Sequence, residues 1–125
     1  MNLLEYQAKR LLRMSDVPTP NSWLLAKDGV AKEPLEYPVV LKSQVPVGGR
    51  GKAGGIIVVH DDDERLKAFA KLMDLSIKGY RPTRIFAEQV IEPKRELYLS
   101  LRINRDARQL EWLVSNNGSG YRGKC

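Results

Sequence analysis

Apolar residues near the N-terminus repeat with the spacing of one face of an α-helix. The residues that follow the i, i+3/4, i+7/8 pattern are Leu3, Leu4, Ala8, Leu11 and Leu12. This spacing predicts a helix over residues 2–14. Asn2 and Glu5 are placed to form a capping box, in which each side chain accepts a hydrogen bond from a backbone N–H that the first turn leaves unpaired.

Further along the chain, apolar residues form short runs that are typical of β-strands. The runs that predict strands are residues 23–26, 39–45, 56–60 and 85–91. Between the third and fourth runs, Asp61 is placed to cap a helix that continues to about Leu75. This order of helix, strands, helix and strands predicts an α+β fold with an antiparallel-rich sheet.

Residues 97–103 alternate between apolar and polar side chains. The apolar positions are Leu97, Leu99, Leu101 and Ile103. A period of two predicts a strand with one buried face. A polar turn at residues 104–107 leads to a second run at residues 110–114, so the pair is expected to form an antiparallel hairpin. Residues 115–125 are rich in glycine and asparagine and are expected to be loose.

Composition narrows the class of protein. The chain has 125 residues, 42% of them hydrophobic and 29% charged, as in one globular domain. Its apolar runs are too short to cross a bilayer, and the acid and amide groups near the start are unlike a secretory signal or transit peptide. Cys125 is the only cysteine, so an internal disulfide is excluded. These features predict a cytoplasmic protein with no membrane partner.

The net charge of +6 suits a partner that carries negative charge. Nucleic acid, an anionic surface and a phosphorylated small molecule all fit, and a solvated surface matched by another subunit is the plain alternative. Tyr80, Tyr98 and Tyr121 are able to stack on bases, which keeps a nucleic-acid-binding module open. The chain holds no known RNA or DNA motif, however, so nucleic acid is the weaker candidate.

The most informative segment is a glycine loop between the second and third predicted strands. Its glycines are Gly48, Gly49, Gly51, Gly54 and Gly55, and Arg50 and Lys52 lie among them. Successive N–H groups in such a loop can converge on phosphate oxygens. A strand-like run follows the loop, which excludes the dinucleotide-binding fingerprint, because that motif needs a helix there. A glycine loop between two strands instead resembles the flap that covers ATP phosphates in protein kinases, and a plain hairpin turn is the alternative.

Three other polar features bear on the chemistry. Lys42 lies in the apolar run before the loop, so its side chain either reaches solvent or points at a ligand. His60 is the only histidine, and its place at a strand end favours a structural or solvated role. The acidic residues 61–63 fit a helix N-terminus more simply than a Mg²⁺ site. No catalytic or metal-binding residue is therefore predicted in this chain.

Three ordered segments resemble the succinyl-CoA synthetase (succinate–CoA ligase) beta-subunit family of ATP-grasp proteins. Residues 1–9 match M-N-L-x-E-Y-Q-A-K, and residues 40–55 match V-x-K-x-Q-V-x-x-G-G-R-G-K-A-G-G. Residues 88–99 match E-x-x-x-x-x-x-K/R-E-L-Y-L. The resemblance implies the N-terminal portion of an ATP-grasp fold, with an antiparallel-rich mixed sheet, flanking helices and a glycine-rich flap.

The resemblance also implies roles for individual residues. Lys42 is expected to contact the nucleotide phosphates, and the tripeptide Gly49, Arg50 and Gly51 to close over the nucleotide. The base and ribose contacts are expected from the third segment. There Glu88 lies on the strand leading into the adenine-binding hinge, Ile91 touches the base through its backbone, and Glu96 holds the ribose hydroxyls. Ordinary strand-edge carboxylates are the alternative for Glu88 and Glu96.

The reaction implied is NTP + carboxylic acid + CoA to NDP + phosphate + acyl-CoA, with ATP or GTP as the nucleotide. In the family the phosphohistidine lies on an alpha-type CoA-binding subunit, which is the expected partner. The Mg²⁺ ligands come from a second lobe that this chain lacks, so the isolated chain is expected to be inactive. A non-catalytic piece that docks on the alpha-type subunit is a further alternative.

The expected organisation is one partial ATP-grasp domain over residues 1–125. Its parts are an N-terminal helix and linker (1–20), a first nucleotide-binding lobe (21–96), a hairpin (97–114) and a loose tail (115–125). Two segments depart from the family pattern: residues 27–38 are short and proline-rich, and Asn117 stands where an acid is usual.

Overall fold

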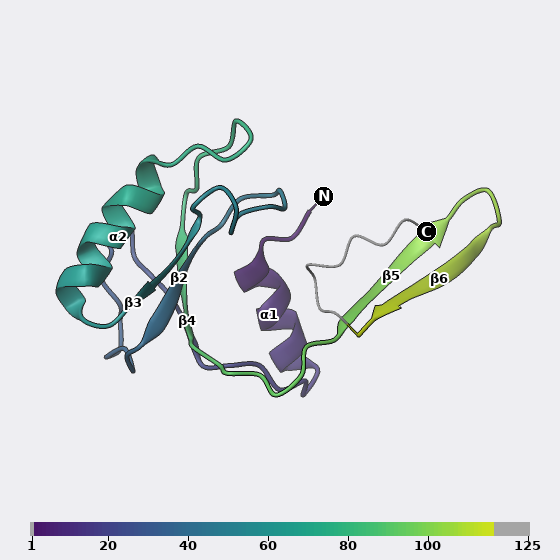
Figure 1. The fold of residues 1–125 in the computed structure, drawn as a ribbon, viewed down its shortest axis with the longest axis horizontal. Helices are drawn as coiled ribbons and strands as arrows, with labels where there is room; N and C mark the ends of the chain where they lie inside the picture. The colour runs from purple at the N-terminus through teal and green to yellow at the C-terminus, as the bar shows by residue number, and fades with distance from the viewer. Residues whose placement is uncertain (1, 117–125) are drawn as a thin grey trace. The chain divides into compact units, whose positions relative to one another are not determined.

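The computed structural model describes residues 2–116. The chain divides into two compact units, one up to Ile91 and one from Glu92 onward. The first contains both helices, α1 (Glu5–Met14) and α2 (Asp62–Asp74), and four strands. The second contains a hairpin of two strands. The structure therefore confirms an α+β fold with antiparallel pairing (Figure 1).

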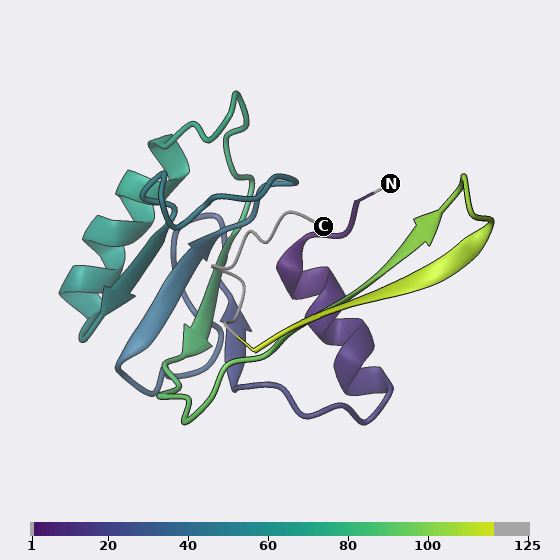
Figure 2. The same cartoon turned by 45° about the vertical axis from the view of Figure 1, so that its right-hand side comes forward.

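The four strands of the first unit form one antiparallel sheet. They are β1 (Ser22–Leu24), β2 (Val39–Ser43), β3 (Ile56–Val59) and β4 (Ile85–Gln89). Their order across the sheet is β1-β4-β2-β3, so β4 lies between β1 and β2 although it comes last in the chain. The 45° turn in Figure 2 shows β2 and β4 side by side between the two helices.

The hydrophobic core lies between the sheet and α2. It is formed by Leu25, Val39, Leu41, Val59, Ala68, Phe69, Leu72, Ile85 and Ala87. In β2 and β4 the core residues alternate with side chains on the opposite face of the sheet, which α1 covers (Figure 1). The residues that α1 meets on that face include charged side chains, which the next subsection describes.

The second helix begins as the sequence predicts. The Asp61 carboxylate accepts a hydrogen bond from the Glu64 N–H at 2.8 Å, which satisfies one unpaired donor of the first turn. His60 is exposed beside Glu64, with Nδ1 3.1 Å from the Glu64 carboxylate. Within residues 2–116 no group of three or more His, Cys, Asp or Glu side chains is arranged to hold a metal ion.

The predicted start of the first helix is wrong. The helix begins at Glu5 rather than Asn2, and the Leu4 N–H donates to the Gln7 side chain at 2.8 Å. Gln7 rather than Glu5 therefore supplies the side-chain cap. Glu5 is unavailable for capping because its carboxylate is bonded to Lys42 and Arg50.

The hairpin of the second unit pairs β5 (Tyr98–Asn104) with β6 (Gln109–Ser115). Three cross-strand pairs place apolar residues on one face: Leu99 with Val114, Leu101 with Trp112, and Ile103 with Leu110. All six side chains are exposed, so the prediction that this strand is half-buried is wrong. An alternating pattern shows that a strand has an apolar face, but it does not supply the residues that cover it.

Neither described helix is long and apolar enough to span a membrane. The tail that the sequence predicts to be loose lies, from residue 117 onward, outside the described residues.

Candidate functional site

Lys42 and Glu88 lie on the face of the sheet that α1 covers. In β2 and β4 every second residue joins the core against α2, so the side chains between them project to the other side. The antiparallel register pairs Lys42 with Phe86 and Val40 with Glu88. Lys42 and Glu88 are therefore diagonal neighbours, a spacing that long side chains can bridge. Lys42 Nζ lies 2.9 Å from Glu88 Oε1.

Helix α1 adds a carboxylate and an amine to these two residues. Glu5 Oε1 lies 2.9 Å from Lys42 Nζ. Lys9, one helical turn further on, pairs with Glu88 and lies 3.4 Å from Glu5 Oε1. The Lys9 ammonium also lies 5.6 Å from the centre of the Phe86 ring, within the range of a cation–π contact.

The glycine loop contributes Arg50 to the same place. Its Nη2 lies 2.6 Å from Glu5 Oε2, and its Nη1 donates to the Ser43 carbonyl at 3.0 Å. We refer to the five side chains Glu5, Lys9, Lys42, Arg50 and Glu88 as the charged cluster. All five are mostly buried, with side-chain exposures from 7% to 21%.

The charged cluster carries three cations and two carboxylates, which leaves a formal charge of +1. Burial by itself would raise the pKa of Glu5, but the hydrogen bonds and positive charges of Lys42 and Arg50 outweigh it and lower the pKa to about 2. Burial and the nearby charge of Lys42 lower the pKa of Lys9. An excess positive charge in a partly buried place attracts an anion more strongly than the same charge in water.

The backbone of the glycine loop is ordered by its own hydrogen bonds. The Ala53 N–H donates to the Gly49 carbonyl at 3.2 Å, and the Gly55 N–H donates to the Arg50 carbonyl at 2.7 Å. Gly49 has a φ of +80°, which glycine adopts without strain. Within residues 2–116, the N–H groups of residues 48–52 donate to no protein acceptor. These donors remain available for the oxygens of a bound anion.

The structure brings together some of the residues that the sequence singles out. Lys42, Arg50 and Glu88 meet in the charged cluster, and Gly49 and Gly51 flank Arg50. Two others are not members of it. Ile91 follows β4 and is 52% exposed, and Glu96 is an exposed residue of the second unit.

Two residues of the charged cluster, Glu5 and Lys9, are absent from the site that the sequence predicts. Their partners on the sheet and the glycine loop lie 37 to 79 residues away, so no local pattern reveals those pairings. The sequence does contain one indication of their role. Glu5 and Lys9 are an acid and a base four residues apart, and they border the predicted apolar face of the helix. Charges at such a border need partners when the helix packs, because a buried unpaired charge is costly.

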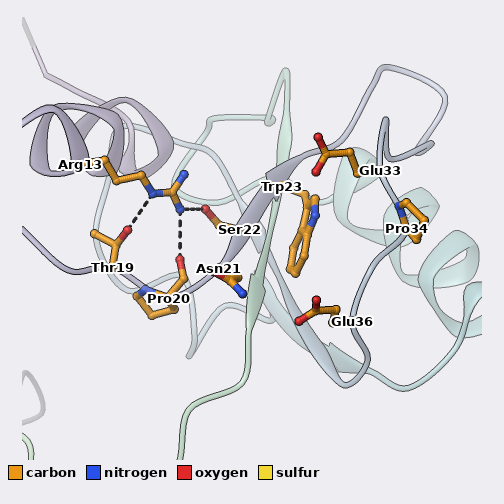
Figure 3. Close-up of a pocket in the computed structure, with 9 residues that line it drawn as sticks. All are labelled: Arg13, Thr19, Pro20, Asn21, Ser22, Trp23, Glu33, Pro34 and Glu36. Carbon is orange, nitrogen blue, oxygen red and sulfur yellow. Dashed lines mark hydrogen bonds between the residues drawn. The ribbon is translucent and has the colours of Figure 1, made fainter.

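A separate concavity lies at the end of α1 and holds none of these residues (Figure 3). Arg13 donates there to the Thr19 hydroxyl at 2.8 Å, to the Pro20 carbonyl at 3.1 Å and to the Ser22 hydroxyl. The guanidinium thus ties the end of α1 to β1. This arrangement fixes the helix over the sheet, and with it the positions of Glu5 and Lys9.

Comparison with known proteins relates the chain to a family. A family model described as an ATP-grasp domain matches residues 2–120. The chain is similar to the protein named succinate–CoA ligase (ADP-forming) subunit beta from Ignicoccus hospitalis, with 41% identity over 121 residues, 94% of this chain and 32% of that protein. The protein of the same name from Methanocaldococcus jannaschii is 37% identical over 119 residues, 94% of this chain and 33% of that protein.

A third protein of that name, from Pyrobaculum islandicum, is 40% identical over 121 residues, 94% of this chain and 32% of that protein. The chain therefore spans about a third of the length of the curated relatives it matches.

Proposed function

This chain belongs to the ATP-grasp domain family, and on that premise we propose that it is the nucleotide-binding portion of an acid–CoA ligase. The proposed whole reaction joins a carboxylic acid to CoA and converts ATP to ADP and phosphate. Relatives named as ADP-forming succinate–CoA ligases support succinate as the acid. The charged cluster beside the glycine loop is the observation that carries the proposal.

The phosphates of the nucleotide are proposed to bind where Lys42 and the glycine loop meet. A Lys ammonium and an Arg guanidinium are the side chains that pair best with phosphate oxygens. The N–H groups of residues 48–52, which donate to no acceptor within residues 2–116, add neutral donors. Gly49, Arg50 and Gly51 are proposed to close over the phosphates, because glycine lets the backbone approach a ligand closely.

The base and ribose are proposed to bind beyond the end of β4. Glu88 lies on the strand that leads there, the backbone of Ile91 is proposed to contact the base, and Glu96 to accept hydrogen bonds from the ribose hydroxyls. A carboxylate suits the last task because it can accept two hydroxyl hydrogen bonds, as in dinucleotide sites.

The metal of the reaction is proposed to be held by another part of the complete enzyme. Phosphoryl transfer usually depends on Mg²⁺ between the phosphates. The described residues do not fit this ion, because the two carboxylates nearest the proposed phosphate position are both paired with cations. We propose that this chain binds and orients the nucleotide, and that it is inactive alone.

An alpha-type CoA-binding subunit is the proposed partner, since the relatives are named as beta subunits. The cytoplasm is the proposed location. The partner follows from the names of the relatives, and the location follows from the composition of the chain.

Amide NMR of the isotope-labelled chain tests the phosphate site. We expect ATP to shift the amide signals of residues 48–52 with an affinity of roughly high-micromolar strength or weaker, because only part of a site is present. AMP at the same concentration should shift them less, because it lacks the β- and γ-phosphates.

A single-stranded oligonucleotide serves as the competing ligand. If it shifted the same amides and displaced ATP, the loop would be a general polyanion site and the proposal would be wrong. Shifts spread evenly over the basic residues of the chain would count against it in the same way.

A further inference from the structure

We propose that Glu5 is a positioning residue of the nucleotide site, which holds Lys42 and Arg50 where both reach the same phosphate chain. The proposal rests on the function proposed above and adds a role for helix α1. Each carboxylate oxygen of Glu5 contacts one of the two cations. Oε1 lies 2.9 Å from Lys42 Nζ, and Oε2 lies 2.6 Å from Arg50 Nη2.

The two cations need such a link because they come from different parts of the chain. Lys42 belongs to β2, whereas Arg50 belongs to the connection that follows it. Long cationic side chains lose considerable rotamer freedom when they bind a ligand. A carboxylate that already holds both removes part of that cost, which is the advantage of a preorganised site.

The bonds to Glu5 leave donors for a ligand. The Lys42 ammonium has three N–H groups, of which Glu5 and Glu88 take two. The Arg50 guanidinium has five, and within residues 2–116 it donates to Glu5 and to the Ser43 carbonyl. Both cations can therefore bind phosphate while Glu5 stays in place.

The position of Glu5 is itself fixed by helix α1. The Tyr6 N–H donates to the Gln44 side chain at 3.1 Å, just beyond the end of β2. One turn later, Lys9 pairs with Glu88, the second carboxylate that holds Lys42. Two contacts of α1, with Gln44 and with Glu88, thus hold the helix beside the strands that carry Lys42 and Glu88.

If only net charge mattered, Glu5 would weaken ATP binding rather than strengthen it. Removing its negative charge raises the formal charge of the charged cluster from +1 to +2, which favours an anion. If Glu5 merely occupied the place of a phosphate, its neutral variant would bind ATP more tightly. A positioning role predicts weaker binding in spite of the added positive charge, so the sign of the change decides between the two.

The experiment compares ATP affinities of the 125-residue chain and its variants by amide NMR titration. We expect Glu5→Gln to weaken ATP binding about tenfold, by analogy with the lower end of the loss seen when a residue that orients a metal ligand is removed. Glu36→Gln is the matched control, because it removes the same charge from an exposed residue outside the charged cluster. Its ATP affinity should stay close to that of the unmodified chain. Glu5→Asp should recover part of the loss, since its carboxylate keeps the charge.

Two readouts separate positioning from a general loss of structure. The affinity for adenosine should not change in Glu5→Gln, because adenosine has no phosphate, and the amide signals of the core should remain. A Lys42→Gln, Glu5→Gln double variant should lose less ATP affinity than the two single losses combined, because Glu5 acts in part through Lys42 and in part through Arg50.

Unchanged or tighter ATP binding by Glu5→Gln would overturn the positioning role, as would an equal loss of adenosine affinity. If Lys42→Gln weakens ATP binding while Glu5→Gln does not, only this inference fails. If the unmodified chain binds no ATP, or Lys42→Gln has no effect, the proposed function fails and the inference fails with it.

Discussion

Lys42 donates hydrogen bonds to Glu5 and to Glu88, so one ammonium group joins helix α1 to the middle of the sheet. Its side chain is mostly buried. Removing one partner of a buried ion pair costs about 3–5 kcal/mol of stability, so an unpaired charge at Lys42 would be strongly destabilising. The two carboxylates offset that cost. At the scale of single residues, the charged cluster therefore serves both the fold and the proposed ligand.

The charge of Glu5 makes the stability of the first unit depend on pH. Burial would raise the pKa of Glu5, yet the bonds from Lys42 and Arg50 lower it from the ordinary value of 4.5 to about 2. Because the pKa is lower in the folded state than in the unfolded state, the ionised carboxylate stabilises the fold above about pH 4.5. That stabilisation is lost as the pH falls from about 4.5 toward 2.

We expect Glu5→Gln to lower the free energy of unfolding by about 1–2 kcal/mol at neutral pH, less than the full pKa shift implies because solvent screens the cluster. Urea unfolding at a series of pH values should show the difference between the two proteins shrinking below about pH 4.5 and vanishing near pH 2. A difference that stayed constant down to that pH would show that Glu5 does not contribute through its charge.

At the scale of elements, the glycine loop owes its shape to close packing at its C-terminal end. A Cβ on Gly55 would lie 2.6 Å from Ile77 Cδ1 and 3.1 Å from the Arg50 carbonyl oxygen. The second neighbour is backbone and cannot easily move. Gly55 thus fixes where the loop joins β3, and with it the placement of Arg50.

Gly55→Ala is expected to destabilise the chain by about 1–3 kcal/mol, the usual cost of forcing an extra carbon into a packed place. Gly48→Ala in the same loop is the control, because a Cβ there meets no atom within 4 Å and its φ is not positive. Thermal unfolding of the two variants measures the difference. Equal stability of both would contradict the packing role of Gly55.

The elements could largely be predicted from the sequence, because each rests on local chemistry. The apolar spacing in β2 and β4 and the Asp61 cap of α2 are properties of neighbouring residues, and the structure confirms them. The start of α1 could not be predicted in this way. Glu5 has two competing uses, and contacts with Lys42 and Arg50, distant in sequence, decide between them.

The candidate site could likewise be predicted only in part from the sequence. Lys42 and Arg50 stand out beside the glycine loop, and the structure brings their side chains to one carboxylate. Lys9 and Glu5 did not stand out, since their roles depend on how α1 packs on the sheet. Whether Ile91 and Glu96 contact a nucleotide stays a prediction, because each is an exposed residue outside the charged cluster.

At the scale of the molecule, the two units differ in how much core they have. The first unit has its own hydrophobic core between the sheet and α2. The hairpin of the second unit exposes its apolar face, including Leu101 and Trp112. A two-stranded hairpin is only marginally stable in water by itself. The proposed nucleotide-phosphate site does not depend on it, because the residues of that site belong to the first unit.

The central claim is that nucleotide phosphate binds at the charged cluster, on the face of the sheet opposite α2. Lys42→Gln removes the cation at its centre, whereas Lys71→Gln removes the same charge from an exposed residue of α2. The most direct measurement is the ATP affinity of these two variants beside the unmodified chain, by amide NMR titration. We expect Lys42→Gln to weaken binding about tenfold or more and Lys71→Gln to change it less than about twofold. Equal losses in the two variants, or no loss in Lys42→Gln, would contradict the claim.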